Sequence, residues 1–304
     1  MSLSGVRMAM AKLGKVEIAD GRLAVIIGAL NLSPDSFYRE SIVRGRGALL
    51  SRAREMVEQG ASIIDVGAMG AGPRSKPVPP EKEMRELIPA IKALASELDV
   101  PISADTQRAD VAEAAIGAGA AVVNDISGLK ADSKMANVIA RTKCSALLMA
   151  TRHAPGDVYE IGEIKRALKG SLDICRENGI SLNRVVIDPA IGYWPARLAC
   201  LGSSANKRLR GYPYNFATFL DLRILARLRE LESLDRPICV GISRKSFIGG
   251  VLGLPRPEER LMGSLAATAI AVLNGVSAVR THDVRETLQA VQLAKAIRDA
   301  GGRT

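Results

Sequence analysis

Short apolar runs alternate with longer amphipathic stretches along almost the whole chain, and this alternation constrains the fold more than any other feature. The apolar runs suit buried parallel strands, and the stretches between them carry the helical spacing of apolar residues. The candidate strands lie at 24–30, 61–66, 101–104, 121–124, 146–149, 184–187, 237–240 and 278–280. The candidate helices lie at 46–59, 80–97, 108–118, 132–141, 160–178, 216–232, 257–274 and 284–299. Eight such pairs predict an α/β fold, a single-domain (β/α)8 TIM barrel.

A doubly wound sheet fits the sequence less well than a barrel. No Gly-x-Gly-x-x-Gly pattern follows the first strand, and no linker divides the chain. We therefore expect the barrel domain to occupy residues 21–304. Residues 1–20 are expected to form an N-terminal extension, a small plug or hairpin at the bottom of the barrel. Asp132 and Asp283 are expected to cap the helices that they precede.

The composition is typical of a globular protein that does not cross a membrane. Of the 304 residues, 47% are hydrophobic, which is enough for one large core. No apolar run approaches the roughly 18 residues that a membrane span needs. Residues 1–15 lack the apolar segment of a signal peptide. We therefore expect a cytoplasmic location and no membrane partner.

The cysteines and histidines do not form a recognisable metal or disulfide pattern. The four cysteines, Cys144, Cys175, Cys200 and Cys239, contain no Cys-x-x-Cys pair, and the chain has two histidines. We expect the thiols to be reduced and partly buried. No Ser-His-Asp or Cys-His arrangement for nucleophilic catalysis is evident from the sequence.

The formal charge of +10 raises nucleic acid as a partner. Basic residues are spread along the chain, however, aromatic residues make up 3%, and no nucleic-acid-binding motif is present. Nucleic acid is therefore a disfavoured partner. The densest basic cluster, Arg197, Lys207, Arg208 and Arg210, lies in a long connection that predicts either a functional loop or a disordered basic segment.

Polar residues stand where the candidate strands end. In a TIM barrel the carboxyl ends of the strands carry the chemistry, so these side chains are expected to converge on one pocket. They are Asn31, Asp65, Asp105 with Thr106, Asn124 with Asp125, Thr151 with Arg152, Asp188, Lys245, and Arg280 with His282.

The types of these residues suit a planar heterocycle and a phosphate. The Asp188 carboxylate can accept two N–H bonds from an amino-pyrimidine edge, and Asp105 and Asn124 can contact further ring nitrogens. Lys245 offers a charge to a ring carbonyl or nitrogen, and Asn31, Arg280 and His282 surround a possible phosphate-binding corner. Other roles stay open: Asp105 could cap the next helix, Asn124 could hold a loop, and His282 could be a core histidine.

An apolar strand stops abruptly at Ser243, Arg244, Lys245 and Ser246. We expect the basic pair Arg244 and Lys245 to face an anionic or carbonyl-bearing ligand. The alternative is that these charges simply end the strand.

Six segments in order resemble the signature motifs of the dihydropteroate synthase family. They are Asn31-Leu-Ser-Pro-Asp-Ser-Phe37, Asp105-Thr106, Asn124-Asp-Ile-Ser-Gly128, Asp188-Pro-Ala-Ile-Gly192, Ser243-Arg-Lys-Ser-Phe-Ile-Gly249 and Arg280-Thr-His-Asp-Val284. That family is a TIM barrel that joins a pterin pyrophosphate to an aryl amine, with loss of pyrophosphate. The resemblance covers residues 31–284.

The resemblance also implies roles for individual residues. The pterin would contact Asp105, Asn124, Asp188 and Lys245, and the pyrophosphate would contact Asn31, Arg280 and His282, with Mg²⁺ held at Asn31. Lys245, Arg280 and His282 would be catalytic, and Phe37, Pro73 and Ser246 would contact the aryl amine. A homodimer packed through the last two helices is implied as well.

The chain departs from the family pattern in loops that meet the second substrate. Arg39 replaces an acidic residue, the segment from Met69 to Gly72 lacks the usual Thr and Arg, and Ala150 stands where a histidine is usual. The amine is therefore expected to be either 4-aminobenzoate or a ribofuranosyl-aminobenzene phosphate, as in folate or methanopterin biosynthesis. The alternatives are a pterin-dependent methyltransferase, or a non-catalytic pterin-binding or nucleic-acid-binding protein.

Overall fold

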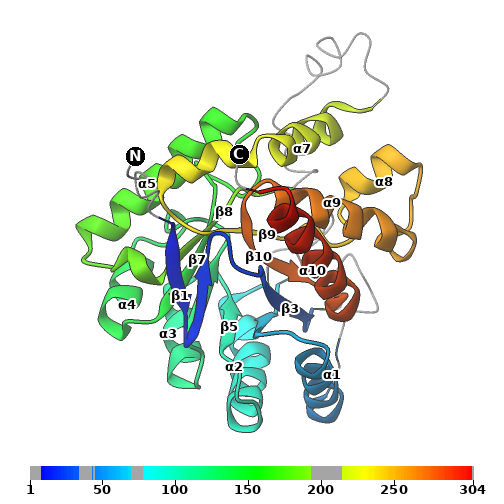
Figure 1. Ribbon diagram of the computed structural model, residues 1–304. Coiled ribbons are helices and arrows are strands. Elements are labelled where there is room, and N and C mark those ends of the chain that lie inside the picture. Colours follow the sequence, from blue (N-terminus) through cyan, green and yellow to red (C-terminus); the bar gives the residue numbers. More distant parts are fainter. Residues whose placement is uncertain (1–7, 34–42, 44, 70–77, 193–213, 303–304) are drawn as a thin grey trace.

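The computed structural model describes residues 8–33, 43, 45–69, 78–192 and 214–302. Its centre is a closed barrel of parallel strands in the order β10-β3-β4-β5-β6-β7-β8-β9, surrounded by helices (Figure 1). The barrel strands are β3 (Val25–Asn31), β4 (Ile63–Gly67), β5 (Ile102–Asp105), β6 (Val122–Asp125), β7 (Ser145–Met149), β8 (Val185–Asp188), β9 (Ile238–Val240) and β10 (Val276–Thr281). The predicted TIM barrel is confirmed.

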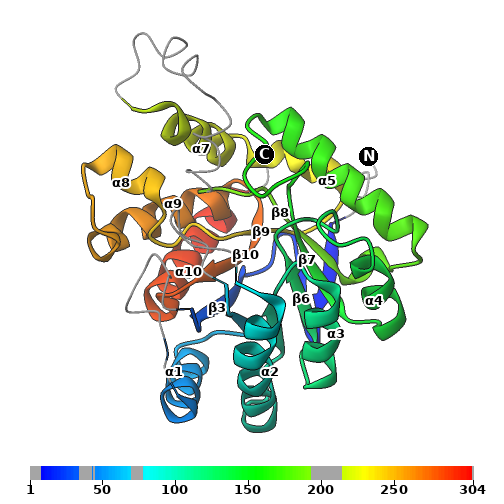
Figure 2. The ribbon, with the colours of Figure 1, turned by 180° about the vertical axis from the view of Figure 1, so that it is seen from behind.

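Helices alternate with these strands and cover the outside of the barrel, as the opposite view also shows (Figure 2). They are α1 (Arg46–Glu58), α2 (Pro80–Glu97), α3 (Ala109–Gly117), α4 (Met135–Thr142), α5 (Ile161–Glu177), α7 (Phe216–Ala226), α8 (Ser246–Leu252), α9 (Leu261–Leu273) and α10 (Val284–Ala300). Short 3-10 helices are η2 (Leu182–Arg184), η4 (Leu228–Leu234) and η5 (Pro257–Arg260).

Two helical segments differ from the sequence prediction. The helix expected over 216–232 stops being α-helical at Ala226 and continues as η4, and α8 was not predicted at all. Helix α8 has seven residues, two of them Gly249 and Gly250, so it carries too little periodic pattern to be recognised.

An antiparallel hairpin precedes the barrel. Its strands are β1 (Met10–Leu13) and β2 (Val16–Ala19), and it lies in front of the barrel in Figure 1. Ala11, Leu13 and Ile18 are buried in one cluster with inward side chains of the barrel, Ile27, Ile63, Val122, Leu147, Val186, Cys239 and Ala278. The Gly14 amide in the hairpin turn donates a hydrogen bond of 3.0 Å to Ser145 Oγ at the start of β7. The hairpin therefore covers the amino-terminal ends of the strands.

The two expected helix caps have different outcomes. Asp132 Oδ1 accepts from the amide of Lys134, the residue before α4, at 3.0 Å, and Asp132 Oδ2 accepts from the amide of Ala109, the first residue of α3, at 2.9 Å. Asp283 stands at the N-cap position of α10, yet its side chain makes no capping bond. Its carboxylate pairs with Arg244 instead. A guanidinium donates two charge-assisted hydrogen bonds, whereas the helix end offers a single neutral amide donor.

Three cysteines lie in the described part of the chain, and all three are buried thiols without disulfide partners. Burial raises the pKa of Cys144, raises that of Cys175 to about 12, and raises that of Cys239 well above the ordinary value of a thiol. Low thiolate content makes such cysteines poor nucleophiles. Among the described residues, no helix is both long and apolar enough to cross a bilayer.

Candidate functional site

One cavity opens at the carboxyl ends of the barrel strands. Seven residues that the sequence placed in the site lie around it: Asn31, Asp105, Asn124, Asp188, Lys245, Arg280 and His282. The remaining lining residues are Met69, Ile126, Met149, Ile191, Gly241 and Ser243. Residues far apart in the sequence meet here because parallel strands end at the same side of the barrel.

One carboxylate of the predicted strand-end set lies beside this cavity and is not among its lining residues. Asp65, in β4, is completely buried, and its Oδ2 accepts bonds from Arg280 Nε at 2.6 Å and from Asn124 Nδ2 at 3.1 Å. Within the described part of the chain, its Oδ1 has no hydrogen-bond partner. In the sequence, Asp65 stands out as a single acid inside an otherwise apolar strand that is fully buried in the structure.

Arg280 also reaches Asp105, with Nη2 at 3.3 Å from Oδ2. Burial, reinforced by the negative charge of Asp65, raises the pKa of Asp105 to about 7, although Arg280 opposes this shift. Asp105 makes no capping bond to α3, whose first amide binds Asp132. The helix-cap alternative for Asp105 was therefore wrong.

Asn124 does not hold the loop that follows β6. That loop is held by the neighbouring Asp125, whose carboxylate accepts bonds from the Ser127 amide, the Ser127 hydroxyl and the Leu129 amide. Asn124 instead orients its amide through Asp65 and lines the cavity.

Asp188 and Lys245 lie on another part of the cavity wall. Asp188 Oδ1 accepts from the Ala190 amide at 2.7 Å, which fixes the carboxylate at the end of β8. Gly192 packs against the lysine stem: a Cβ there would lie 2.6 Å from Lys245 Cδ. Gly192 also has a φ of 84°, which glycine adopts without strain, so backbone and lysine stem pack closely.

Arg244 does not face the cavity, contrary to our expectation for the basic pair. It has a φ of 55°, and its guanidinium makes a bidentate pair with Asp283, at 2.9 Å from Nε to Oδ2 and 2.7 Å from Nη2 to Oδ1. It also donates to the carbonyls of Pro257 and Glu258. The left-handed turn at Arg244 separates the two cations, so Lys245 alone lines the cavity.

The three residues predicted to meet the aryl amine do not all lie in the described structure. Ser246 is half-buried, begins α8 and directly follows Lys245, but it is not among the cavity-lining residues. Phe37 and Pro73 lie outside the described residues.

His282 connects the cavity to Asn31 and Ser243. Asn31 Nδ2 lies 3.2 Å from His282 Nε2, and Ser243 Oγ lies 3.2 Å from His282 Nδ1. Burial, and the charges of Arg280, Lys245, Arg244 and Arg52, lower the pKa of His282 to about 3. The ring is therefore neutral and lines the cavity, rather than supplying positive charge or filling the core.

Ser243, His282 and Asp283 lie together, an arrangement that the sequence did not reveal. Ser243 Oγ contacts both His282 Nδ1 and Asp283 Oδ2, the latter at 3.3 Å. In a nucleophilic triad the histidine stands between serine and acid, one ring nitrogen to each. Here the serine stands in the middle and is buried, so the expectation of no such triad holds.

Few protein groups are available to hold a metal. The described residues contain no cluster of three or more His, Cys, Asp or Glu side chains able to bind a cation. Mg²⁺ usually keeps several waters and takes one or two protein oxygens together with substrate phosphates. A single amide oxygen from Asn31, beside the cationic Arg280, fits a magnesium ion that arrives with a phosphorylated substrate.

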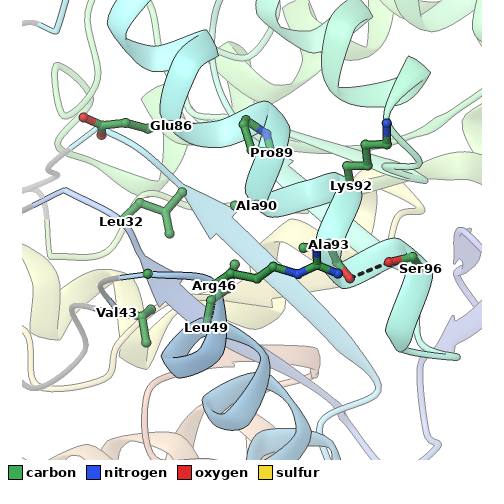
Figure 3. A pocket seen from close by; sticks show the side chains of 11 residues that line it. Leu32, Val43, Arg46, Leu49, Glu86, Pro89, Ala90, Lys92, Ala93 and Ser96 are labelled. Carbon is green, nitrogen blue, oxygen red and sulfur yellow. Dashed lines mark hydrogen bonds between the residues drawn. The ribbon is translucent and has the colours of Figure 1, made fainter.

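A second, larger cavity lies between α1 and α2 (Figure 3). Its wall is mostly apolar, and the charged groups that line it are Arg46, Glu86 and Lys92. No carboxylates converge there as they do at the strand ends, so we place the chemistry in the smaller cavity.

Known proteins resemble this chain over most of its length. The sequence matches the family described as Pterin binding enzyme over residues 27–200 and 217–282. It is 35% identical over 286 residues to dihydropteroate synthase of Synechocystis sp., covering 91% of both chains. It is 34% identical to dihydropteroate synthase of Bacillus subtilis, covering 91% of this chain and 90% of the other.

Solved structures of dihydropteroate synthases also resemble this chain. A dihydropteroate synthase from Clostridium difficile, crystallised in the presence of pteroic acid, is 36% identical with a TM-score of 0.76, covering 91% of this chain and 98% of the other. A Xanthomonas albilineans dihydropteroate synthase with 4-aminobenzoic acid is 28% identical with a TM-score of 0.79, covering 96% and 98%.

The raised pKa of Asp105 predicts a pH-dependent effect of Asp105→Asn on stability. Between the pKa of an unfolded aspartate, about 3.9, and the folded value of about 7, the folded protein holds a proton that the unfolded chain has lost. The contribution of this group to stability therefore falls as the pH rises through that interval. Asparagine does not titrate. The melting temperature of the variant minus that of the wild type should therefore rise by roughly 2 °C or more between pH 5 and pH 8.

Thermal unfolding at both pH values measures this gain. Asp173→Asn, on the exposed side of α5, is the matched control and should show no such trend. A difference between Asp105→Asn and wild type that is the same at pH 5 and pH 8 would contradict the assignment.

Proposed function

The chain belongs to the family of pterin binding enzymes and is a transferase of the dihydropteroate synthase type, and we propose that it condenses 6-hydroxymethyl-7,8-dihydropterin pyrophosphate with an aryl amine, releasing pyrophosphate. The resemblance predicted from the sequence motifs is confirmed by these matches. The observation that carries the proposal is the convergence of carboxylates, an amide and cations on one cavity at the strand ends.

The carboxylate side of the cavity suits the pterin ring. Asp188 is held by the Ala190 amide with its carboxylate at the cavity, where it can accept two N–H bonds from the amino-pyrimidine edge. Asp105 and Asn124, both held by bonds within the Asp65 and Arg280 cluster, would contact other ring nitrogens. Lys245 would lie against the ring carbonyl or nitrogen.

Arg280, His282 and Asn31 suit the pyrophosphate. The Arg280 guanidinium is oriented by Asp65 and Asp105, so it meets a phosphate without first having to be ordered. Neutral His282 adds no charge at this end of the cavity and contacts the amide of Asn31 at 3.2 Å. Bound Mg²⁺, held by the Asn31 amide oxygen and the phosphates, would neutralise the charge that develops on the leaving group.

The reaction needs charge stabilisation more than a strong base. The bond between the pterin methylene carbon and the pyrophosphate oxygen breaks, and the amine nitrogen forms the new bond to that carbon. Arg280 stabilises the departing charge, and Asp188 and Asn124 hold the ring in position for attack. Lys245, Arg280 and His282 are thus the residues to which we assign catalysis.

The aryl amine is 4-aminobenzoate or a ribofuranosyl-aminobenzene phosphate. Supporting the first is the Xanthomonas albilineans relative, whose structure was solved with 4-aminobenzoic acid. Supporting the second are the basic residues Arg39, Arg74, Lys76 and the cluster of 197–210, all outside the described residues. The buried thiols suit the reducing cytoplasm, where we place the enzyme.

We also propose a homodimer packed through α9 and α10, which lie side by side. Large apolar side chains are exposed on both helices, with exposed fractions of 73% for Met262, 48% for Ile270, 64% for Leu293 and 54% for Ile297. An exposed apolar stripe of this kind is typical of an interface. Ala267 and Ala271 of α9 are buried and therefore pack within the subunit.

Substitution of Asp188 tests the pterin site. Asp188→Asn replaces an acceptor by an amide donor that faces the N–H groups of the ring, and should cost about 2 to 4 kcal/mol of binding. Calorimetric titration with 6-hydroxymethylpterin measures this loss, with Asp173→Asn as the control on an exposed carboxylate. An affinity within twofold of wild type would remove Asp188 from the site.

A panel of aryl amines tests the second substrate. If a phosphate meets the basic loops, each charge-assisted bond contributes roughly 1.5 to 3 kcal/mol, so kcat/KM should favour the phosphorylated amine by about tenfold or more. The preference should shrink as salt is added, since salt screens charges in water. It should also shrink in Arg74→Ala, since this variant lacks one of the cations. A preference for plain 4-aminobenzoate that neither change alters would identify the enzyme as a folate-pathway synthase.

Sedimentation tests the dimer. Wild-type protein at micromolar concentration should have twice the mass of one chain, and Ile297→Glu should sediment as a monomer because it buries a charge in the interface. Met10→Glu, a matched change at an exposed apolar position on the hairpin, should leave the mass unchanged. A wild-type mass of one chain would refute the dimer.

A further inference from the structure

Five side chains from three strand ends form a continuous row behind the cavity. Asn31 ends β3, Ser243 and Arg244 follow β9, and His282 and Asp283 follow β10. Asn31 Nδ2 lies 3.2 Å from His282 Nε2, and His282 Nδ1 lies 3.2 Å from Ser243 Oγ. Ser243 Oγ in turn lies 3.3 Å from Asp283 Oδ2. The Asp283 carboxylate accepts from Arg244 at 2.7 and 2.9 Å. Asn31 and His282 line the cavity, whereas Arg244 is held away from it.

The direction of every hydrogen bond in this row follows from its Arg244 end. A guanidinium can only donate and a carboxylate can only accept, so the hydroxyl of Ser243 must donate its single proton to Asp283. The Ser243 oxygen is then an acceptor, and the His282 backbone amide also points at it, at 3.4 Å. Its contact with the imidazole therefore requires a proton on His282 Nδ1.

A neutral imidazole protonated at Nδ1 carries a lone pair on Nε2. Only a donor can meet that lone pair, and the amide nitrogen of Asn31 is the group placed there, at 3.2 Å. The oxygen of a planar amide lies on the opposite side from its nitrogen. The Asn31 Oδ1 is consequently turned away from the ring.

We propose that the Arg244–Asp283 ion pair, acting through Ser243 and His282, sets the orientation of the Asn31 amide and so presents its oxygen to the magnesium pyrophosphate. Arg244, Asp283 and Ser243 act here as positioning residues, through the ring of His282. The use of that oxygen rests on the function proposed above, whereas the orientation itself does not. Groups that orient a metal ligand in this way typically change metal affinity by 10- to 100-fold when removed.

The row also explains why the two adjacent cations, Arg244 and Lys245, differ in role. The left-handed backbone at Arg244 sends its side chain to Asp283, while Lys245 lines the cavity. Buried ion pairs are costly unless their remaining bonds are satisfied, and Arg244 satisfies its own with the carbonyls of Pro257 and Glu258.

Histidine NMR tests the proposal directly, because the chain has only two histidines. In protein labelled with ¹⁵N-histidine, His153→Gln assigns the signals of His282. The full-length wild-type protein, without ligand, should show His282 protonated at Nδ1 and unprotonated at Nε2. Protonation at Nε2 in the wild type would overturn the proposal.

Two variants should reverse this tautomer. Ser243→Ala removes the acceptor of the Nδ1 proton, and Asn31→Asp removes the amide donor to Nε2 without emptying a core position. Both should show protonated Nε2, and Ser243→Thr, which keeps the hydroxyl, should restore the wild-type pattern. A ring that stays protonated only at Nδ1 in both variants would overturn the proposal.

Binding provides the second readout. Ser243→Ala should weaken binding of magnesium pyrophosphate by about tenfold, and leave the affinity for 6-hydroxymethylpterin unchanged. Ser277→Ala deletes a buried hydroxyl at the other end of the barrel, where it donates to Asp20, and is the matched control. Unchanged magnesium pyrophosphate affinity in Ser243→Ala would overturn the positioning role. Wild-type protein with the expected tautomer that binds no magnesium pyrophosphate would instead contradict the proposed function.

Discussion

The buried carboxylate of Asp65 holds the polar end of the barrel together. Burying a charge costs several kcal/mol unless it is paired and hydrogen-bonded, and Asp65 meets this condition with Arg280 at 2.6 Å and Asn124 at 3.1 Å. Arg280 extends the connection to Asp105. Strands β4, β5, β6 and β10 are thereby joined at their carboxyl ends by charge and hydrogen bonds. The side chains stay ordered around a cavity that apolar packing would have filled.

The position of this polar layer follows from the period of the strands. Inward side chains at the lower level include Ile63, Val122, Val186 and Ala278, which pack under the hairpin. Because side chains in a strand alternate, the next inward position is two residues further along. That rule leads to Asp65, Asn124, Asp188 and Arg280 in turn. One layer thus closes the barrel and the next carries polar side chains, and strands β4, β6, β8 and β10 contribute to both.

This regularity is why so much was predictable from the sequence. The barrel and the convergence of the strand-end residues follow from local alternation and from the shared direction of parallel strands. Asp65 was expected among the strand-end residues, but its bonds to Arg280 and Asn124 were not predicted, since one acid inside a strand gives no hint of its partners. Arg244 was misassigned because the backbone turn that separates it from Lys245 depends on its distant partner, Asp283. Helix α8 was missed because seven residues with two glycines carry almost no pattern.

The charges divide the cavity into two ends with different responses to pH. At the end where we propose the phosphate, His282 is surrounded by cations and stays neutral, so positive charge there comes from Arg280, which does not titrate in proteins. At the end where we propose the pterin, burial with the charge of Asp65 brings the pKa of Asp105 to about 7. The pKa of Asp105 is thus raised and that of His282 is lowered, although both residues line the same cavity. The charge around His282 is thus constant across the physiological range, whereas the charge of Asp105 changes with pH.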